Sequence, residues 1–274
     1  IHELLVWMEQ LKSKGTPVKA MLGELLTHNL EGNRVDLSLW PVQDGQDQNP
    51  QRQTNGENPM LVNDLPEALD WIFSHPVRQV DLLMDNAGFE MLSDLCMLAF
   101  LLDQGVIEQA VLHVKPYPVF VSDVIEDDVY HSIHLLKGQM DKYPQLAALG
   151  EQLESHLSAG AIRIRRGGFW GLPFVFWEMD REVEENLSRA DLIISKGDAN
   201  YRRLVGDRRW DYQKPFSSVV SYMSAPLLAI RVIKSEPGAG YPLADFSRMT
   251  QTDPEWMRNG KWGSIQFWDG QQGV

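Results

Sequence analysis

The sequence of 274 residues lacks the features that mark secreted, membrane-spanning or nucleic-acid-binding proteins. Its single cysteine, Cys96, excludes an intrachain disulfide and fits a reducing compartment. No apolar run approaches the length of a membrane span, since the run at residues 95–102 is far too short, and no signal peptide is visible. The net charge is -13 and no long basic run occurs, which argues against nucleic-acid or anionic-membrane partners. We therefore expect a cytoplasmic protein, with the nucleus as the alternative.

Several catalytic motifs are also missing. There is no G-x-x-x-x-G-K-[ST] loop for nucleoside triphosphates, no G-x-S-x-G elbow and no H-E-x-x-H zinc motif. A haloacid-dehalogenase-type phosphatase would need a second aspartate two residues after Asp85, where this chain has Ala87. Only Gly88 stands in the first turn after a predicted strand, so a dinucleotide or methyl-donor site of the Rossmann type has weak support.

The first 30 residues predict helices. Apolar residues recur at helical spacing over residues 1–11 and again over 18–26, where Thr16 is the expected N-cap and Pro17 the first helical residue. The chain begins with Ile1 rather than Met, so we expect its true N-terminus to be missing or processed. Residues 41–63 are rich in Gln and Asn without periodicity and are expected to form a polar surface loop.

From residue 65 onward, short β-rich runs alternate with helical runs. This alternation predicts a three-layer α/β/α fold with a mostly parallel central sheet, formed by one domain over residues 31–274. The predicted strands are 80–84, 109–114, 161–164, 191–195 and 227–233. The predicted helices are 65–73, 90–104, 127–136, 143–157, 181–188, 199–205 and 216–223.

Polar residues follow several of these strands, at the sheet edge where α/β proteins bind ligands. Asp85 and Asn86 follow the first strand and offer the oxygen ligands that Mg²⁺ and Mn²⁺ prefer. Ser122 and Asp123 follow a second apolar run. Each pair has an ordinary alternative explanation as a helix cap, through an N-cap at Asp85 or Asn86 and a capping box between Ser122 or Asp123 and Glu126.

Basic residues follow two later strands. Lys196, together with arginines of the next helix, is a candidate for holding an anion, and Gly197 permits a close backbone approach. Lys234 follows the last of the predicted strands and is expected to point toward the same crevice. The alternatives are a capped helix with a solvated basic face and an edge-strand lysine that reaches solvent.

Five ordered segments carry a resemblance to a known family. They are "DNAGFEMLSDL", "FVSDV", "ADLIISKGDANYRRLVGDRRW", "IRVIKSE" and "NGKWGSIQF". The sequence resembles the metal-dependent damage-control phosphatases (domain of unknown function 89), in the branch named for acidic-residue methyltransferase and sugar-phosphate phosphatase activity. It departs from the family pattern at the early motif, where Glu31 replaces an aromatic residue and Arg34 replaces a lysine. Family members usually carry a larger N-terminal helical region, so the resemblance implies that residues 1–30 are a remnant of it.

The resemblance implies a phosphatase that hydrolyses sugar phosphates such as fructose 1-phosphate and fructose 6-phosphate with one divalent ion (Mn, Co, Ni or Mg). It makes Asp85, Asn86 and Asp123 the metal ligands, and Asp85, Asp123 and Glu90 the catalytic residues. Asp198 is a second candidate for activating water. The implied substrate-binding residues are Asp85, Asn86, Glu90, Asp123, Asp198, Ala199, Asn200, Tyr201, Arg202 and Lys234.

Two alternatives remain open at the level of sequence. One is a protein-glutamate carboxyl methyltransferase that uses S-adenosylmethionine, which tight binding of the methyl donor would support. The other is a non-catalytic protein without metal, which metal analysis of the purified chain would detect. The sequence does not define the oligomeric state.

Overall fold

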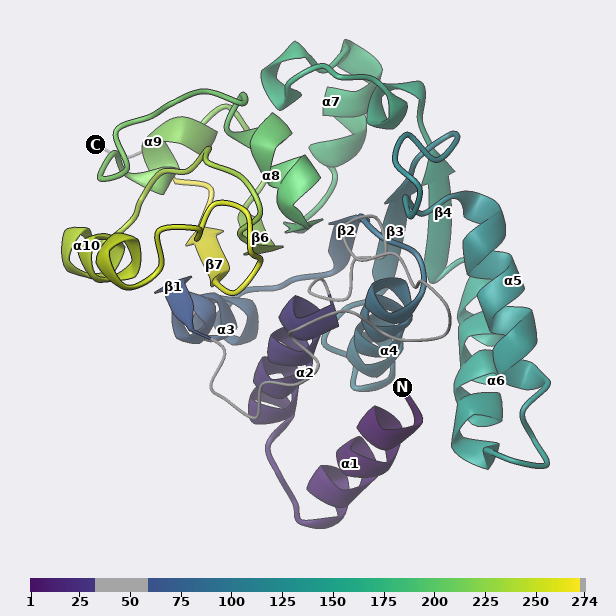
Figure 1. The fold of residues 1–274 in the computed structure, drawn as a ribbon. Coiled ribbons are helices and arrows are strands. Elements are labelled where there is room, and N and C mark those ends of the chain that lie inside the picture. Colours follow the sequence, from purple (N-terminus) through teal and green to yellow (C-terminus); the bar gives the residue numbers. More distant parts are fainter. Residues whose placement is uncertain (33–58, 272–274) are drawn as a thin grey trace, which may run out of the picture.

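The computed structural model describes residues 1–32 and 59–271, and its central feature is a mixed sheet between two layers of helices (Figure 1). Within these residues the sheet has seven strands in the order β1-β7-β6-β5-β2-β3-β4. The expected α/β fold with a mostly parallel sheet is therefore confirmed. The early motif at Arg34 and most of the polar segment 41–63 lie outside the described residues.

Five neighbouring strands are parallel and form the main part of the sheet. Because β3 lies on one side of β2 and β5 on the other, the chain reverses its direction of progress between β2 and β5. Open α/β sheets bind ligands at such a switch point, outside the carboxyl ends of the strands. The five strands are β2 (Gln79–Leu83), β3 (Gln109–Val114), β4 (Ile162–Arg166), β5 (Leu192–Lys196) and β6 (Leu227–Val232).

The other two strands complete one side of the sheet. Strand β7 (Gly263–Trp268) runs antiparallel to β6, and the edge strand β1 (Met60–Asn63) pairs parallel to β7. Strand β1 lies inside the segment predicted to be a polar loop, so that prediction is wrong for residues 60–63. The sequence analysis also missed β7 and the helix α10 (Leu243–Thr252), whose Met249 packs with Leu61 in a small separate core.

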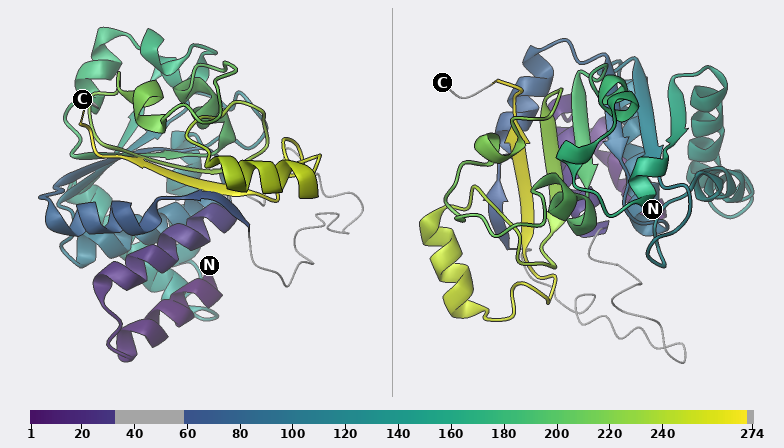
Figure 2. Two further views of the ribbon diagram at one scale, coloured as in Figure 1. Left: turned by 90° about the vertical axis from the view of Figure 1, so that its left-hand side faces the viewer. Right: turned by 90° about the horizontal axis from the view of Figure 1, so that it is seen from above.

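Successive strand residues point to opposite faces, and both faces are covered by helices (Figure 2). In β5, for example, Leu192 and Ile194 join the larger core while Ile193 joins the core on the other face. The larger core includes residues of α1 (His2–Ser13), α2 (Val18–Gly32), α3 (Leu65–Ser74), α4 (Phe89–Asp103), α5 (Glu126–Lys137) and α6 (Pro144–Ser158). The opposite core includes residues of α7 (Arg181–Leu187), α8 (Asp198–Leu204) and α9 (Phe216–Val220).

The two N-terminal helices belong to the larger core. Leu4 and Met8 of α1 and Leu25 of α2 are buried in it, so the expected helices are present and pack on the sheet domain. Helix α2 continues to Gly32, beyond the apolar pattern of residues 18–26. Whether these helices are the remnant of a larger region stays a prediction. No helix in the described part of the chain is long and apolar enough to cross a bilayer.

Candidate active site

A pocket of ≈ 500 Å³ opens at the carboxyl edge of the sheet, between the segments that follow β2 and β5. We call it the acidic pocket because three aspartates line it. Most of the polar residues singled out in the sequence converge here, although they come from four separate stretches of the chain. Its lining comprises Asp85, Asn86, Val119, Phe120, Val121, Asp123, Asp198, Ala199, Arg202 and Lys234.

Backbone hydrogen bonds hold the Asp85–Asn86 segment against the Ser122–Asp123 segment. The Val124 amide donates to the Asp85 carbonyl at 3.0 Å, the Ala87 amide donates to the Ser122 carbonyl at 2.7 Å, and Asn86 and Asp123 form an antiparallel bridge. The N-cap of α4 is Gly88, with φ 80° and without a side-chain cap. The capping explanation of Asp85 and Asn86 is therefore wrong, and both side chains line the pocket instead.

The Asn86 amide has a fixed orientation. Its Nδ2 donates to Asp85 Oδ2 and to Glu90 Oε2, both at 3.0 Å, while its Oδ1 accepts from Ser122 Oγ at 2.7 Å. The amide nitrogen is thus held between two carboxylates. An amide oxygen has two lone pairs, so Asn86 Oδ1 keeps one acceptor position beyond its bond from Ser122.

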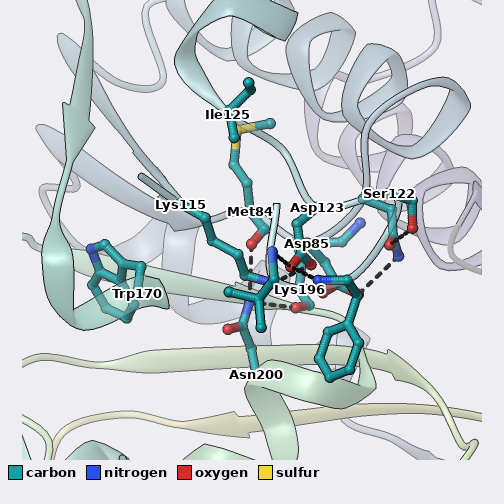
Figure 3. Close-up of polar contacts among 12 residues, drawn as sticks. Met84, Asp85, Lys115, Ser122, Asp123, Ile125, Trp170, Lys196 and Asn200 are labelled. Atoms are coloured by element: carbon teal, nitrogen blue, oxygen red, sulfur yellow. Dashed lines mark hydrogen bonds and ion pairs between the residues drawn. The ribbon is translucent and has the colours of Figure 1, made fainter. Parts of the chain in front are cut away.

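Asp123 lies on the loop after β3, where Lys115 contributes a further charge. The Lys115 ammonium pairs with Asp123 Oδ1, and the Val119 and Phe120 amides donate to Asp123 Oδ2 at 2.9 and 2.7 Å (Figure 3). The expected capping box with Glu126 does not form, because Asp128 accepts from the Ile125 amide instead. The sequence analysis missed Lys115, although it directly follows β3 and the rule applied to the other strand ends would have found it.

Asp85 is the most strongly perturbed group of the pocket. Its pKa is raised to about 7, chiefly by burial and then by the neighbouring Glu90 carboxylate, while Lys115 and Lys234 act in the opposite direction. Gly197 makes room for this carboxylate, because a Cβ atom at position 197 would collide with it. The close approach that Gly197 was predicted to permit is thus made to a side chain of the protein.

Lys196 does not reach the pocket, which corrects its assignment as an anion-binding residue. It is completely buried, and its ammonium lies 3.0 Å from Asp94 Oδ1 and 3.3 Å from Glu90 Oε1 and donates to the Asn29 carbonyl. Glu90 is likewise buried outside the lining of the acidic pocket. Glu90 contacts the pocket through its hydrogen bond from Asn86.

Asp198 and Lys234 lie next to each other in the lining of the acidic pocket. The buried Arg231 guanidinium donates to Asp198 Oδ1 at 3.0 Å, and the Lys234 amide donates to the same oxygen at 3.2 Å. Strand β6, which carries Arg231, lies between β5 and β7, so Lys234 follows an internal strand. The edge-strand explanation of Lys234 is therefore wrong.

Three other predicted substrate-binding residues make bonds within the protein. The Asn200 amide donates to the Met84 and Lys196 carbonyls at 3.0 Å, and Tyr201 is buried with its hydroxyl on Gln266. Arg202 lines the pocket but forms a bidentate ion pair with Asp207, with N–O distances of 2.8 and 2.7 Å. Of the segment 198–202, the pocket thus exposes Asp198, Ala199 and Arg202.

The donors available for a cation are two carboxylates and one amide oxygen. Within residues 1–32 and 59–271, no group of three or more His, Cys, Asp and Glu side chains is arranged to hold a metal ion. The set Asp85, Asn86 and Asp123 fits Mg²⁺ or Mn²⁺ chemically, because such ions use one or two carboxylates and complete their coordination with water and phosphate oxygens.

The fold and this pocket define the chain as an α/β protein with an acidic, lysine-lined pocket at the switch point of its sheet. The chain belongs to the family of the damage-control phosphatase ARMT1-like domain, whose model matches residues 1–247.

Similar proteins from vertebrates carry the same family name. The chain is 30% identical to the damage-control phosphatase ARMT1 of Danio rerio, over 97% of this chain and 62% of that protein. It is 33% identical to that of Bos taurus and 30% identical to that of Homo sapiens, in each case over 89% of this chain and 58% of the relative. The chain thus spans about three fifths of the length of these relatives. A solved structure of a DUF89 family protein from Pyrococcus horikoshii aligns with a TM-score of 0.47 at 14% identity, covering 86% of this chain and 68% of that one.

Proposed function

We propose that this chain is a metal-dependent phosphatase that hydrolyses sugar phosphomonoesters such as fructose 1-phosphate and fructose 6-phosphate. The observation that carries the proposal is the convergence of Asp85, Asn86, Asp123 and Lys234 on one pocket at the switch point of the sheet. Membership of the family supports it, since the similar proteins are named damage-control phosphatases.

In this proposal Asp85, Asn86 and Asp123 hold the divalent ion. When bound, such an ion polarises a phosphoryl oxygen and acidifies a water molecule. Lys234 lines the acidic pocket and Lys115 pairs with its Asp123, so both supply positive charge near the place where the phosphate of the substrate would carry its negative charge. Arg202 would contact the sugar hydroxyls from the rim.

Between the two candidates for water activation, the geometry favours Asp198. Its carboxylate lines the acidic pocket, and one of its oxygens accepts from Arg231 and from the Lys234 amide, which fixes its orientation. Glu90 would act indirectly. It accepts a hydrogen bond from the Asn86 amide nitrogen, which would leave Asn86 Oδ1 to bind the ion.

The test is hydrolysis of fructose 1-phosphate by the purified chain, with and without Mn²⁺. We expect turnover that depends on the ion and falls at least about a hundredfold in Asp85→Ala, because removal of a main electrostatic contributor typically costs that much. Asp70→Ala, a change at an exposed aspartate of α3, is the matched control and should leave turnover unchanged. Equal activity of wild type and Asp85→Ala, with or without the ion, would refute the proposal.

A further inference from the structure

A second pocket, of ≈ 420 Å³, adjoins the acidic pocket. The two share four lining residues, Val119, Phe120, Ala199 and Arg202. Because these residues border both spaces, the two pockets are neighbouring compartments of one depression. We call the second one the apolar pocket, since its remaining lining includes the apolar side chains of Trp170, Leu172, Pro173 and Val175.

Two loops build the walls of the apolar pocket. One is the loop 116–121 after β3, and the other is the segment 168–175 after β4. They touch at Gly171, where an added Cβ atom would lie 3.0 Å from Pro116 Cγ. The Arg203 guanidinium fastens the second loop by donating to the Phe169 and Phe174 carbonyls at 2.9 and 2.8 Å. The pocket is therefore a built feature with anchored walls.

Large apolar side chains are unusually exposed around this pocket. Phe120 is 58% exposed, Val119 46% and Leu172 41%, although each lines the concave space. Exposed apolar clusters of this kind mark sites that bind a ligand or a partner. A concave space next to a pocket with convergent polar groups is typical of a small-molecule site.

The polar side chains of the apolar pocket already have partners within the protein. Asn200 donates to two carbonyls, Arg202 pairs with Asp207, and Lys115 pairs with Asp123. The surface that remains for a ligand is thus mainly the apolar wall. A hexose phosphate, which is polar throughout, would gain little from that wall.

We propose that the apolar pocket is a second subsite, which receives an aromatic or branched apolar group on the alcohol part of a phosphomonoester. This inference rests on the proposed function, because it places the phosphate of the same substrate in the acidic pocket. Fructose phosphates would fill the acidic pocket alone. Esters with an apolar group two or three bonds beyond the phosphate would fill both compartments and bind more tightly.

The test compares two phosphonates that cannot be hydrolysed, propylphosphonate and 3-phenylpropylphosphonate, by calorimetry with the whole chain in Mg²⁺. They differ only in the phenyl ring. We expect the phenyl compound to bind about tenfold more tightly or better, because burial of a ring removes on the order of 100 Å² of apolar surface from water. In Leu172→Ser and Val175→Thr this advantage should shrink by about threefold or more, while the Kd of propylphosphonate stays the same.

Leu243→Ser is the matched control, because Leu243 is an exposed leucine on α10 outside the lining of the apolar pocket. It should keep the full advantage of the phenyl compound. Equal Kd values for the two phosphonates, or absence of binding by both, would overturn the subsite. The first result is compatible with hydrolysis of fructose 1-phosphate, so it separates failure of this inference from failure of the proposed function.

Discussion

At the scale of single residues, Gly197 and Asp85 depend on each other. Gly197 has φ 84°, a conformation that glycine adopts without strain, and its missing side chain leaves the space that the Asp85 carboxylate occupies. The buried carboxylate comes from the turn after β2 and the glycine from the turn after β5. The contact between these two turns therefore fixes where a proposed metal ligand lies.

We predict that Gly197→Ala displaces Asp85 and abolishes the proposed metal-dependent phosphatase activity. It should also destabilise the fold by more than the roughly 1 kcal/mol expected from backbone strain alone. Gly105→Ala is the control, because Gly105 has φ 64° but open space around its Cα, so this variant incurs only the strain. Urea unfolding and turnover of fructose 1-phosphate measure both effects. Full activity in Gly197→Ala would contradict the prediction.

The sequence indicated most of the strand ends that contribute residues to the acidic pocket, but it did not show which way each side chain points. Asp85, Asn86, Asp123 and Lys234 could be named because polar residues after buried strands stand out in the sequence. The burial of Lys196 could not be foreseen, because its partners Glu90 and Asp94 lie on a helix that is distant in sequence. Only the packing of α4 on β5 converts this strand-end lysine from a pocket residue into a buried ion pair.

At the scale of elements, one wall of the apolar pocket, the segment 168–175, is held by the Arg203 side chain of α8. Arg203 donates to the carbonyls of Phe169, Trp170 and Phe174, so it replaces regular backbone pairing in the segment 168–175. Burial lowers its pKa to about 10, so it stays charged at neutral pH. Its guanidinium also lies over the Phe169 ring, at 4.8 Å from the ring centre.

We predict that Arg203→Gln loosens this segment and destabilises the protein by about 2 kcal/mol, since it removes charged hydrogen bonds to three backbone carbonyls, two of which are partly buried. Amide hydrogen exchange should accelerate in residues 168–175 and stay unchanged in β2. In contrast, Arg181→Gln breaks only an exposed pair with Glu185 and should cost less than about 0.5 kcal/mol. Unaltered exchange of residues 168–175 in Arg203→Gln would count against this role.

The hydrophobic pattern of each strand explains whether the sequence could predict it. Four of the five parallel strands (β2, β3, β5 and β6) are buried along most of their length, and an apolar run such as 227–233 stands out as a buried strand. Strand β1 has only four residues and follows a long polar segment, and β7 contains Gln266 and Ser264, whose burial no sequence pattern shows. Neither strand could be predicted from its own residues. Each is identified by its pairing in the sheet, β1 with β7 and β7 with both β1 and β6.

At the scale of the whole molecule, an acidic chain places several of its carboxylates in its interior. Burial raises the pKa of Asp94 to about 7, against the lowering effect of the Lys196 ammonium, and burial raises that of Asp85 likewise. In the unfolded chain the reference pKa of such a carboxyl is 3.8. The folded protein therefore holds protons that the unfolded chain releases, and stability falls as pH rises from the unfolded to the folded pKa.

We predict that the free energy of unfolding of the metal-free protein decreases between pH 4 and pH 7, with a slope of up to about 1.4 kcal/mol per pH unit from each such group. Asp94→Asn keeps the shape of the side chain without its charge, so it should remove part of this slope. Asp70→Asn, on an exposed residue, should leave the slope unchanged. Urea unfolding at several pH values measures it, and an equal slope in Asp94→Asn and wild type would refute the assignment.

Because β7 lies between β1 and β6, strand β1 cannot join the sheet until β7 has emerged from the ribosome. Strand β1 emerges well before β7, yet in the described sheet β7 is its hydrogen-bonded neighbour. The Asp64 carboxylate, which follows β1 directly, likewise accepts from the Phe267 amide. The segment 60–64 must therefore wait until β7 has emerged, so this edge of the sheet is exposed to mispairing with other chains during co-translational folding.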